Sequence, residues 1–190
     1  MPADTIPARL FRNAVSAPGR PGYHEKIEGS YRAVDWQGYA SGVRQAARAL
    51  IALGFAPGQH AAILGFNRPE WVITYLAAMA AGGAAAGIYI TSSGDEVAYI
   101  LGHAEAPVVV VEGEDQLQKV LGRRQDLPAL RWVVTMRGTP PRDDPMVLTW
   151  EEFLGKGEAV TDTELDARLG ARSGDDPATL IYTSGTTGLP

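Results

Sequence analysis

The chain has 190 residues, of which 45 % are hydrophobic and 21 % are charged, a composition typical of a soluble globular domain and not of a disordered segment. Seventeen lysine and arginine residues against 22 acidic residues give a net charge of −5, and the basic residues are scattered, which argues against a nucleic-acid partner. Because cysteine is absent, disulfides, thiolate nucleophiles and cysteine-based metal sites are excluded.

A β-hairpin and a long amphipathic helix are predicted at the start of the chain. Residues 23–34 alternate loosely around a Gly29-Ser30 turn, which is the pattern of a hairpin. Asp35 then offers an N-cap, and apolar residues recur every three or four positions over residues 36–54. The helix therefore has an apolar stripe that needs a partner.

Strands and helices alternate over the rest of the chain. Buried strands are expected at residues 61–65, 84–90, 107–112, 131–136 and 178–182. Helices are expected at residues 70–81, 94–103, 114–124 and 150–154. Ser93 and Glu96 form a capping-box signature, while Glu70 suits a helix start electrostatically and is not interpreted as a catalyst. Connections this short predict an α/β fold, with a mostly parallel sheet wrapped by helices in βαβ units.

Two features bear on location. Residues 71–94 carry no charge and are numerous enough to cross a bilayer, but alanine and glycine dominate them and Gly82-Gly83 interrupts them. A helix that ends at the glycine pair and continues as a buried strand explains this stretch better than a membrane span. Because the N-terminus has no apolar core of signal-peptide length, we predict a cytoplasmic protein.

The residues after the last expected strand are the most informative about function. They place four hydroxyls and two glycines together, at Thr183, Ser184, Gly185, Thr186, Thr187 and Gly188. Successive backbone N–H groups in such a turn form a concavity that suits an anion, and the hydroxyls add rotatable donors. The Walker A pattern does not fit, because only two residues separate the glycines. We predict a polyphosphate-binding loop; the alternative is a Ser/Thr/Gly tail without a ligand.

The sequence YTSGTTGLP at residues 182–190 resembles the phosphate-binding loop of the AMP-forming adenylate superfamily, which includes acyl-CoA synthetases, adenylation domains and luciferase. Further similarity lies in residues 36–54, 61–64, 67–71 and 87–93, and the last of these is similar to the bubblegum-type branch of long-chain fatty acyl-CoA synthetases. The resemblance therefore implies an N-terminal subdomain portion of the adenylate-forming ligase fold.

The resemblance also implies a reaction. Such a ligase activates a fatty acid with ATP to give acyl-AMP and then transfers the acyl group to CoA, with Mg²⁺ as the metal. The six loop residues 183–188 would hold ATP phosphates. Because the family's other nucleotide, metal, acyl and catalytic-lysine residues follow this loop, the chain alone is predicted to be inactive, with no catalytic or metal residue assigned in it.

The resemblance suggests two parts, 1–54 and 55–190. In a complete family member, the helix over residues 36–53 would pack on sequence that this chain lacks, so we expect the chain to self-associate through it. The expected partners are small molecules, namely fatty acid, ATP and CoA, and peripheral membrane contact of the full protein stays open.

Two other functions fit the sequence. One is an AMP-forming ligase for an aryl or amino acid, and the other is a non-catalytic phosphate-binding α/β module. The three histidines, His24, His60 and His103, lie far apart without ligand spacing and are interpreted as surface or helix-end residues.

Overall fold

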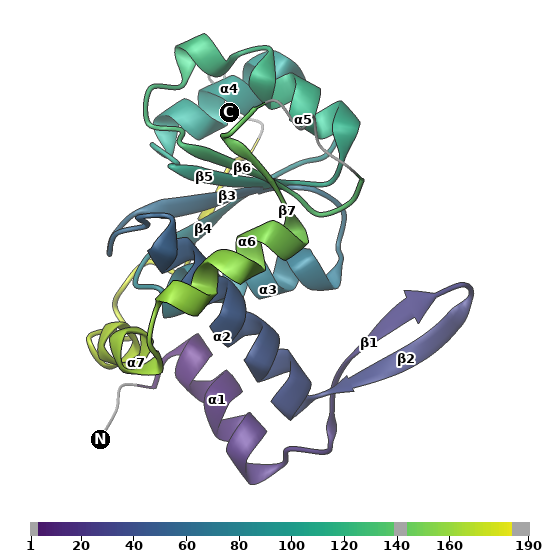
Figure 1. Cartoon of the computed structure of the whole chain (residues 1–190), viewed down its shortest axis with the longest axis vertical. Coiled ribbons are helices and arrows are strands. Elements are labelled where there is room, and N and C mark those ends of the chain that lie inside the picture. The colour runs from purple at the N-terminus through teal and green to yellow at the C-terminus, as the bar shows by residue number, and fades with distance from the viewer. Residues whose placement is uncertain (1–3, 139–143, 184–190) are drawn as a thin grey trace.

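The computed structural model describes residues 4–138 and 144–183, and Figure 1 shows the chain as one body with a projecting hairpin. The strands are β1 (Pro21–Ile27), β2 (Ser30–Asp35), β3 (His60–Leu64), β4 (Ala84–Ile88), β5 (Val108–Val111), β6 (Trp132–Thr135), β7 (Val147–Thr149) and β8 (Thr179–Ile181). The α-helices are α1 (Ile6–Ser16), α2 (Trp36–Ala52), α3 (Pro69–Ala80), α4 (Gly94–His103), α5 (Glu114–Leu121), α6 (Trp150–Lys156) and α7 (Asp162–Gly170). Short 3₁₀ helices are η1 (Arg124–Asp126) and η2 (Gly157–Ala159).

The six-stranded sheet is parallel throughout, in the order β7-β6-β5-β3-β4-β8. The chain runs from β3 through α3 to its neighbour β4, and then returns through α4 to β5 on the other side of β3. Strand order therefore reverses beside β3, and such a reversal leaves room for a ligand outside the carboxyl ends of the strands.

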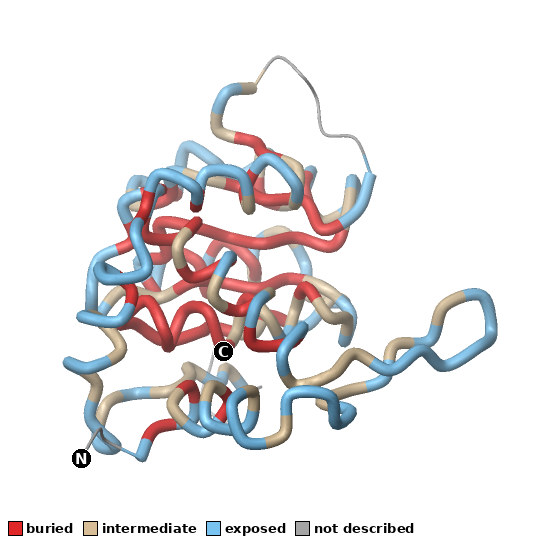
Figure 2. The backbone as a smooth tube through the Cα atoms, turned by 60° about the horizontal axis from the view of Figure 1, so that its bottom comes forward, coloured by how far each residue is buried: buried red, intermediate tan, exposed pale blue. Residues whose placement is uncertain are grey.

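Alternate residues of each strand face opposite layers of helices. In β5, Val108 and Val110 belong to the core shared with α2, α3 and α6, whereas Val109 and Val111 belong to the core shared with α4 and α5. Figure 1 shows the two layers on opposite sides of the sheet, and Figure 2 shows the buried residues running through its middle. A three-layer α/β fold with a parallel sheet is thus confirmed.

The packing of α2 differs from the prediction. Val43, Ala46, Ala47 and Leu50 are fully buried, and α2 packs on α1, α3, α6 and η2 of the same chain. The expectation that this helix exposes an apolar stripe was therefore wrong, because α1 and α6 supply the missing partners. Self-association through residues 36–53 loses its physical basis, while the division of the chain at residue 54 stays a prediction.

Local capping signals fix several helix starts as predicted. The Asp35 carboxylate accepts the Gly38 N–H at 2.7 Å, and Ser93 and Glu96 form a complete capping box at the start of α4. A second capping box, Thr149 with Glu152, starts α6 directly after β7. These caps satisfy N–H groups that a helix cannot satisfy internally.

Helix α7 and strand β7 were not predicted. Helix α7 lies within the acidic stretch before β8 and fully buries Leu165, while β7 has only three residues. Helix α1, whose role the sequence did not indicate, buries Leu10 against the α2 layer.

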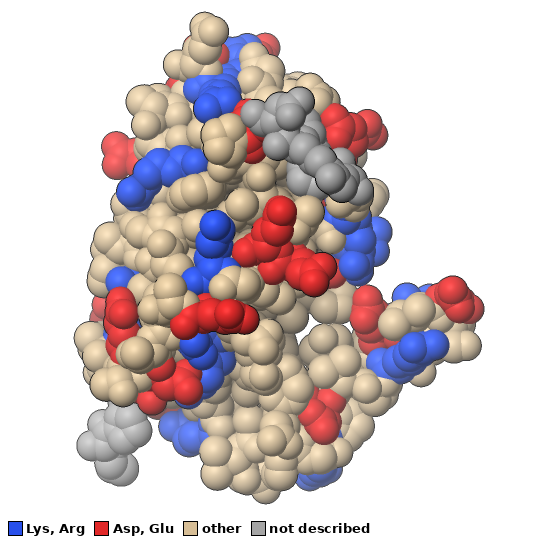
Figure 3. Space-filling view, in the orientation of Figure 1, with Lys and Arg blue, Asp and Glu red and all other residues tan. Residues whose placement is uncertain are grey.

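The hairpin of β1 and β2 projects from the body, as Figures 1 and 2 show. Its base contacts α2 through an edge-on packing of Tyr23 against Tyr39, with ring centroids 4.9 Å apart. On the face drawn in Figure 3, side chains of both charge signs are interspersed. Within the described residues, every helix is too short or too polar to cross a bilayer.

Candidate functional site

Three loops meet at the carboxyl ends of β3, β4 and β8. Because these strands are parallel neighbours, the residues that follow each of them lie on the same side of the sheet. They are Gly65 to Asn67 after β3, Tyr89 and Ile90 after β4, and Tyr182 and Thr183 after β8. The residue that opens the predicted phosphate loop thus lies where the fold leaves room for a ligand.

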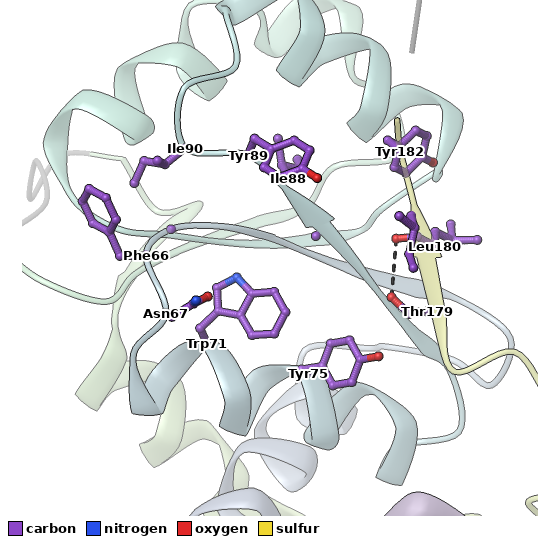
Figure 4. Close-up of a pocket in the computed structure, with 13 residues that line it drawn as sticks. Phe66, Asn67, Trp71, Tyr75, Ile88, Tyr89, Ile90, Thr179, Leu180 and Tyr182 are labelled. Atoms are coloured by element: carbon purple, nitrogen blue, oxygen red, sulfur yellow. Dashed lines mark hydrogen bonds between the residues drawn. The ribbon is translucent and has the colours of Figure 1, made fainter. Parts of the chain in front are cut away.

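A pocket of about 650 Å³ opens between these loops and α3. Its lining is largely aromatic and aliphatic: Gly65, Phe66, Asn67, Trp71, Tyr75, Gly87, Ile88, Tyr89, Ile90, Thr179, Leu180, Ile181 and Tyr182. Figure 4 shows Trp71 and Tyr75 rising from α3 on one side, Tyr89 on the opposite side, and Tyr182 at the β8 end. Such a lining suits an apolar group, with a few polar atoms at its rim.

The aromatic wall of the pocket comes from one face of α3. Trp71 and Tyr75 are four residues apart and therefore neighbours on the helix, and their rings stack with centroids 5.4 Å apart. Pro69 in the first turn of α3 has no N–H that would need a partner there. This helix lies where the sequence predicts it, over residues 69–80.

A buried carboxylate holds the turn that follows β3. Glu112, only 8 % exposed at the carboxyl end of β5, accepts the Phe66 N–H at 3.0 Å and forms a short ion pair with Arg68. Both partners stabilise the charged form of a carboxyl group that is otherwise shielded from water. Glu112 thereby orients Phe66, which lines the pocket.

A second ion pair ties α3 to the loop after β6. Glu70 is buried, and its Oε1 lies 2.9 Å from Arg137 Nη1, while Oε2 has no hydrogen-bond partner among the described residues. Arg137 also lies 3.8 Å from Glu25 of the hairpin. The interpretation of Glu70 as a helix-start charge holds, since it is in the first turn of α3, and the structure adds its cationic partner.

Two side chains anchor the residues that lead into the predicted phosphate loop. The Thr179 hydroxyl donates to Ala85 O at 3.1 Å, and the Tyr182 hydroxyl lies 3.0 Å from Nδ1 of His103. Burial, and then the neighbouring Tyr99, raise the pKa of Tyr182.

Only part of the predicted loop can be placed. Thr183 is exposed at the carboxyl end of the sheet. The other loop residues lie outside the described residues; they are Ser184, Gly185, Thr186, Thr187 and Gly188. Their role as ligands of phosphate stays a prediction.

The histidines occupy different environments. His60 Nδ1 lies 2.9 Å from Ala104 O, His103 is the last residue of α4, and His24 lies in the hairpin. Across residues 4–138 and 144–183, no three histidine or acidic side chains gather closely enough to hold a metal ion.

Sequence reasoning missed most of the pocket. The sequence predicted the helix that carries Trp71 and Tyr75, but not that their rings line a pocket, and Phe66 was not singled out. The available signal was positional, since Phe66 comes directly after the predicted strand 61–65 and Tyr89 lies near the end of the predicted strand 84–90 of a parallel sheet. The pairs Glu112–Arg68 and His103–Tyr182 join residues 44 and 79 positions apart, and no local pattern indicates them.

Curated relatives at moderate identity cover nearly the whole chain. It is 36 % identical over 188 residues to "Long-chain-fatty-acid--CoA ligase ACSBG2" of Homo sapiens, covering 98 % of this chain and 28 % of that protein. It is 37 % identical over 165 residues to "Long-chain-fatty-acid--CoA ligase ACSBG1" of Bos taurus, covering 87 % of this chain and 23 % of that protein. The chain thus spans about a quarter of the length of these relatives.

A solved structure agrees with this similarity. The anthranilate CoA ligase AuaEII, solved in complex with anthranoyl-AMP, superposes with a TM-score of 0.78 at 25 % identity, over 97 % of this chain and 33 % of that chain. The family described as "AMP-binding enzyme" matches residues 10–190. From the parallel sheet, the loop that leaves β8 and these matches, we conclude that the chain belongs to the AMP-binding enzyme family.

Proposed function

We propose that the chain supplies the phosphate-holding part of an AMP-forming long-chain fatty acid–CoA ligase. In that reaction a fatty acid carboxylate attacks the α-phosphate of ATP, so that an O–P bond forms and the bond to the leaving pyrophosphate breaks. The CoA thiol then displaces AMP from the acyl-AMP, giving the thioester.

The observation that carries the proposal is the position of Thr183. It leaves β8 at the carboxyl end of the parallel sheet, beside the aromatic pocket, and is exposed. Hydroxyl and N–H donors at residues 183–188 would orient the β- and γ-phosphates and stabilise the charge that develops on departing pyrophosphate. Preoriented donors achieve this without reorganising during the reaction.

Mg²⁺ would supply further charge neutralisation on the phosphates. Among the described residues, no three histidine or acidic side chains lie together so as to hold a metal ion. In this proposal the chain contributes the phosphate loop and the pocket wall. The apolar lining would hold an uncharged portion of a substrate next to the loop.

Calorimetric titration of the 190-residue chain with inorganic pyrophosphate tests the loop. We expect saturable binding that Thr183→Val weakens several-fold, because the substitution removes a hydroxyl donor and keeps the branched shape. Thr163→Val, at an exposed position of α7 far along the chain from the loop, is the matched control and should bind like the unmodified chain. Equal affinity of all three proteins would overturn the assignment.

The ligase activity is tested on two proteins. The chain alone should give no acyl-CoA from palmitate, ATP, Mg²⁺ and CoA, whereas the longer protein that contains it should release pyrophosphate and form the thioester. Sustained thioester formation by the chain alone would contradict the proposal that the chain supplies only part of the ligase.

One observation favours a second substrate class. The similarity to a structure described as an anthranilate CoA ligase covers 97 % of the chain, so an aryl acid is the alternative substrate. Palmitate, benzoate and an amino acid compared in one pyrophosphate-release assay distinguish the two classes. If none is activated but pyrophosphate binds, a non-catalytic phosphate-binding module is the better description.

A further inference from the structure

We propose that His103 is a positioning residue for the phosphate loop: it holds Tyr182, the residue immediately before Thr183. The inference rests on the proposed function of residues 183–188, but its geometric part stands on described residues alone. His103 lies 79 positions from Tyr182 in sequence, and their side chains meet at 3.0 Å.

Strand β8 needs such an anchor because little else holds its end. Within residues 4–138 and 144–183, it is an edge strand of three residues that pairs only with β4, and the last of these, Ile181, is 76 % exposed. Backbone pairing with β4 ends at Ile181, opposite Gly87. An edge strand with one neighbour frays more easily than a central one, so contacts of Tyr182 decide how well the start of the loop is fixed.

Aromatic packing reinforces the hydrogen bond. The His103 ring meets the Tyr182 ring edge-on, with centroids 5.7 Å apart, and lies nearly parallel to the Tyr99 ring at 6.0 Å. The histidine is thus held by two rings, one on its own helix and one on β8. These contacts fix the orientation of the imidazole as well as its distance from the phenol.

Helix α4, which carries His103, is held firmly in the fold. Helix α4 begins with a full capping box, and it buries Val97, Ile100 and Leu101 against the sheet. His103 is its last residue, where a partial negative charge of the helix also suits an imidazole. Nδ1 can accept a hydrogen bond from the Tyr182 O–H when it carries no proton, and Nδ1–H can donate one to the phenol oxygen when it does.

Anchoring the root of the loop lowers the cost of binding an anion there. A loop that is already ordered at its first residue loses less conformational freedom when phosphate binds. Loss of the anchor should therefore weaken phosphate binding by about three- to tenfold, the equivalent of one ordinary hydrogen bond, without removing any phosphate ligand.

The experiment uses the isotopically labelled 190-residue chain, and the variants His103→Ala, His103→Asn and Tyr182→Phe. NMR relaxation gives the order parameter of the Thr183 amide, and titration with inorganic pyrophosphate gives its affinity. We expect His103→Ala and Tyr182→Phe to lower both quantities, and the double variant to be no worse than either single variant, because both remove the same contact. His103→Asn retains a polar group near Nδ1 and should restore most of the affinity.

The matched control is Tyr31→Phe, which removes a phenol hydroxyl from an exposed position of hairpin strand β2, outside the pocket. It should leave the Thr183 amide and the affinity unchanged. If His103→Ala leaves the Thr183 order parameter unchanged, or if the Asn variant is as impaired as the Ala variant, the positioning role is overturned. If the unmodified chain does not bind pyrophosphate, the proposed function of the loop fails, while the order parameter still decides the role of His103.

Discussion

The sheet has a hollow at each end of its strands, an amino side and a carboxyl side, and the two hollows are similar in size but differ in chemistry. At the amino ends of the strands, a hollow of about 610 Å³ is lined by Arg168 and Arg172 of the α7 region, and their guanidinium groups donate to backbone carbonyls of Phe55, Ala81, Gly82 and Pro177. At the carboxyl ends, the hollow of about 650 Å³ is lined by aromatic side chains.

This difference indicates that the amino side of the sheet stabilises the fold, whereas the carboxyl side suits binding. On the amino side, the guanidinium groups of Arg168 and Arg172 are hydrogen-bonded to backbone carbonyls, so this side stabilises the fold. On the carboxyl side, Phe66 and Tyr89 remain 56 % and 69 % exposed, and ion pairs hold the loops without filling the pocket. Large exposed aromatic residues around one hollow are typical of a surface that another group covers.

The largest expected effect is on the amino side, at Gly83. A Cβ on this residue would lie 2.1 Å from Gln59 O and 2.7 Å from the Phe55 ring, and the Gln59 oxygen is fixed because it accepts the Ala84 N–H. Gly83→Ala should therefore lower the free energy of unfolding by about 3 kcal/mol or more, measured by urea denaturation. Gly155→Ala, where a Cβ meets nothing within 4 Å, is the control and should be neutral or slightly stabilising. Similar unfolding midpoints for the two variants would contradict this account.

Alkaline pH should lower the stability of the fold through Tyr39. Burial, and then the charge of Tyr23, raise the pKa of Tyr39 to about 12 from 10.0, and Tyr39 lies beside the start of α3. The unfolded chain loses this proton at lower pH than the folded chain. The contribution is therefore fully present below pH 10 and lost between about pH 10 and 12, on the order of 2–3 kcal/mol.

Denaturant unfolding at pH 9 and pH 11.5 measures this loss, and Tyr39→Phe should remove most of it. A Phe variant with an unchanged pH dependence would assign the effect to other groups. The arginines of the amino side stay charged throughout this range, so their contacts should not contribute to it.

A moderate effect is expected at Arg168, again on the amino side. Its guanidinium donates to Phe55 O at 2.7 Å and to Ala81 O at 3.1 Å. Arg168→Met keeps the stem but leaves both carbonyls without this donor, and should cost about 2 kcal/mol of stability while pyrophosphate binding stays unchanged. Arg123→Met, which removes only exposed ion pairs, should cost less than about 1 kcal/mol. A loss of pyrophosphate affinity in the Arg168 variant would show that the two sides are coupled.

The smallest effect is expected at Tyr89 in the carboxyl-side pocket. Because its side chain is mostly exposed, Tyr89→Ala should change the free energy of unfolding by no more than about 0.5 kcal/mol in a thermal or urea experiment. Tyr75→Ala, which removes a ring stacked on Trp71, should cost about 1 kcal/mol or more. If Tyr89→Ala proves as costly as Tyr75→Ala, the pocket wall is part of the stabilising core.

Elements with strong local signals could be predicted from the sequence. Val108 to Val111 form a strand because four consecutive β-branched residues fit a sheet that is covered on both faces, and Ser93 with Glu96 fixes the start of α4. Helix α7 gives almost no signal, because its apolar face is short: Leu165 is fully buried, and Leu169 packs partly buried against the core. The partners of α2 could not be predicted, since α6 lies about a hundred residues further along the chain.

The candidate site was predictable only in part. A hydroxyl- and glycine-rich loop after a strand is a local pattern, and the strand β8 was found where it was expected. The pocket is tertiary: Asn67, Tyr89 and Tyr182 come together only because β3, β4 and β8 are neighbours. The strand order that makes them neighbours depends on long-range pairing that no short window of sequence encodes.

The pairing of β8 with β4 has a consequence for the order in which the molecule assembles. His60 pairs with Ala84 and Val108 with Trp132, each across 24 positions, whereas Thr179 reaches Ala85 across 94 positions. Closing the longer segment costs more chain entropy, so the sheet of β3 to β6 can form during synthesis before β8 joins it. Among the strands of this sheet, the one that leads into the predicted phosphate loop would then dock late and detach early, so the pocket at its carboxyl end would form only after the strands beside it.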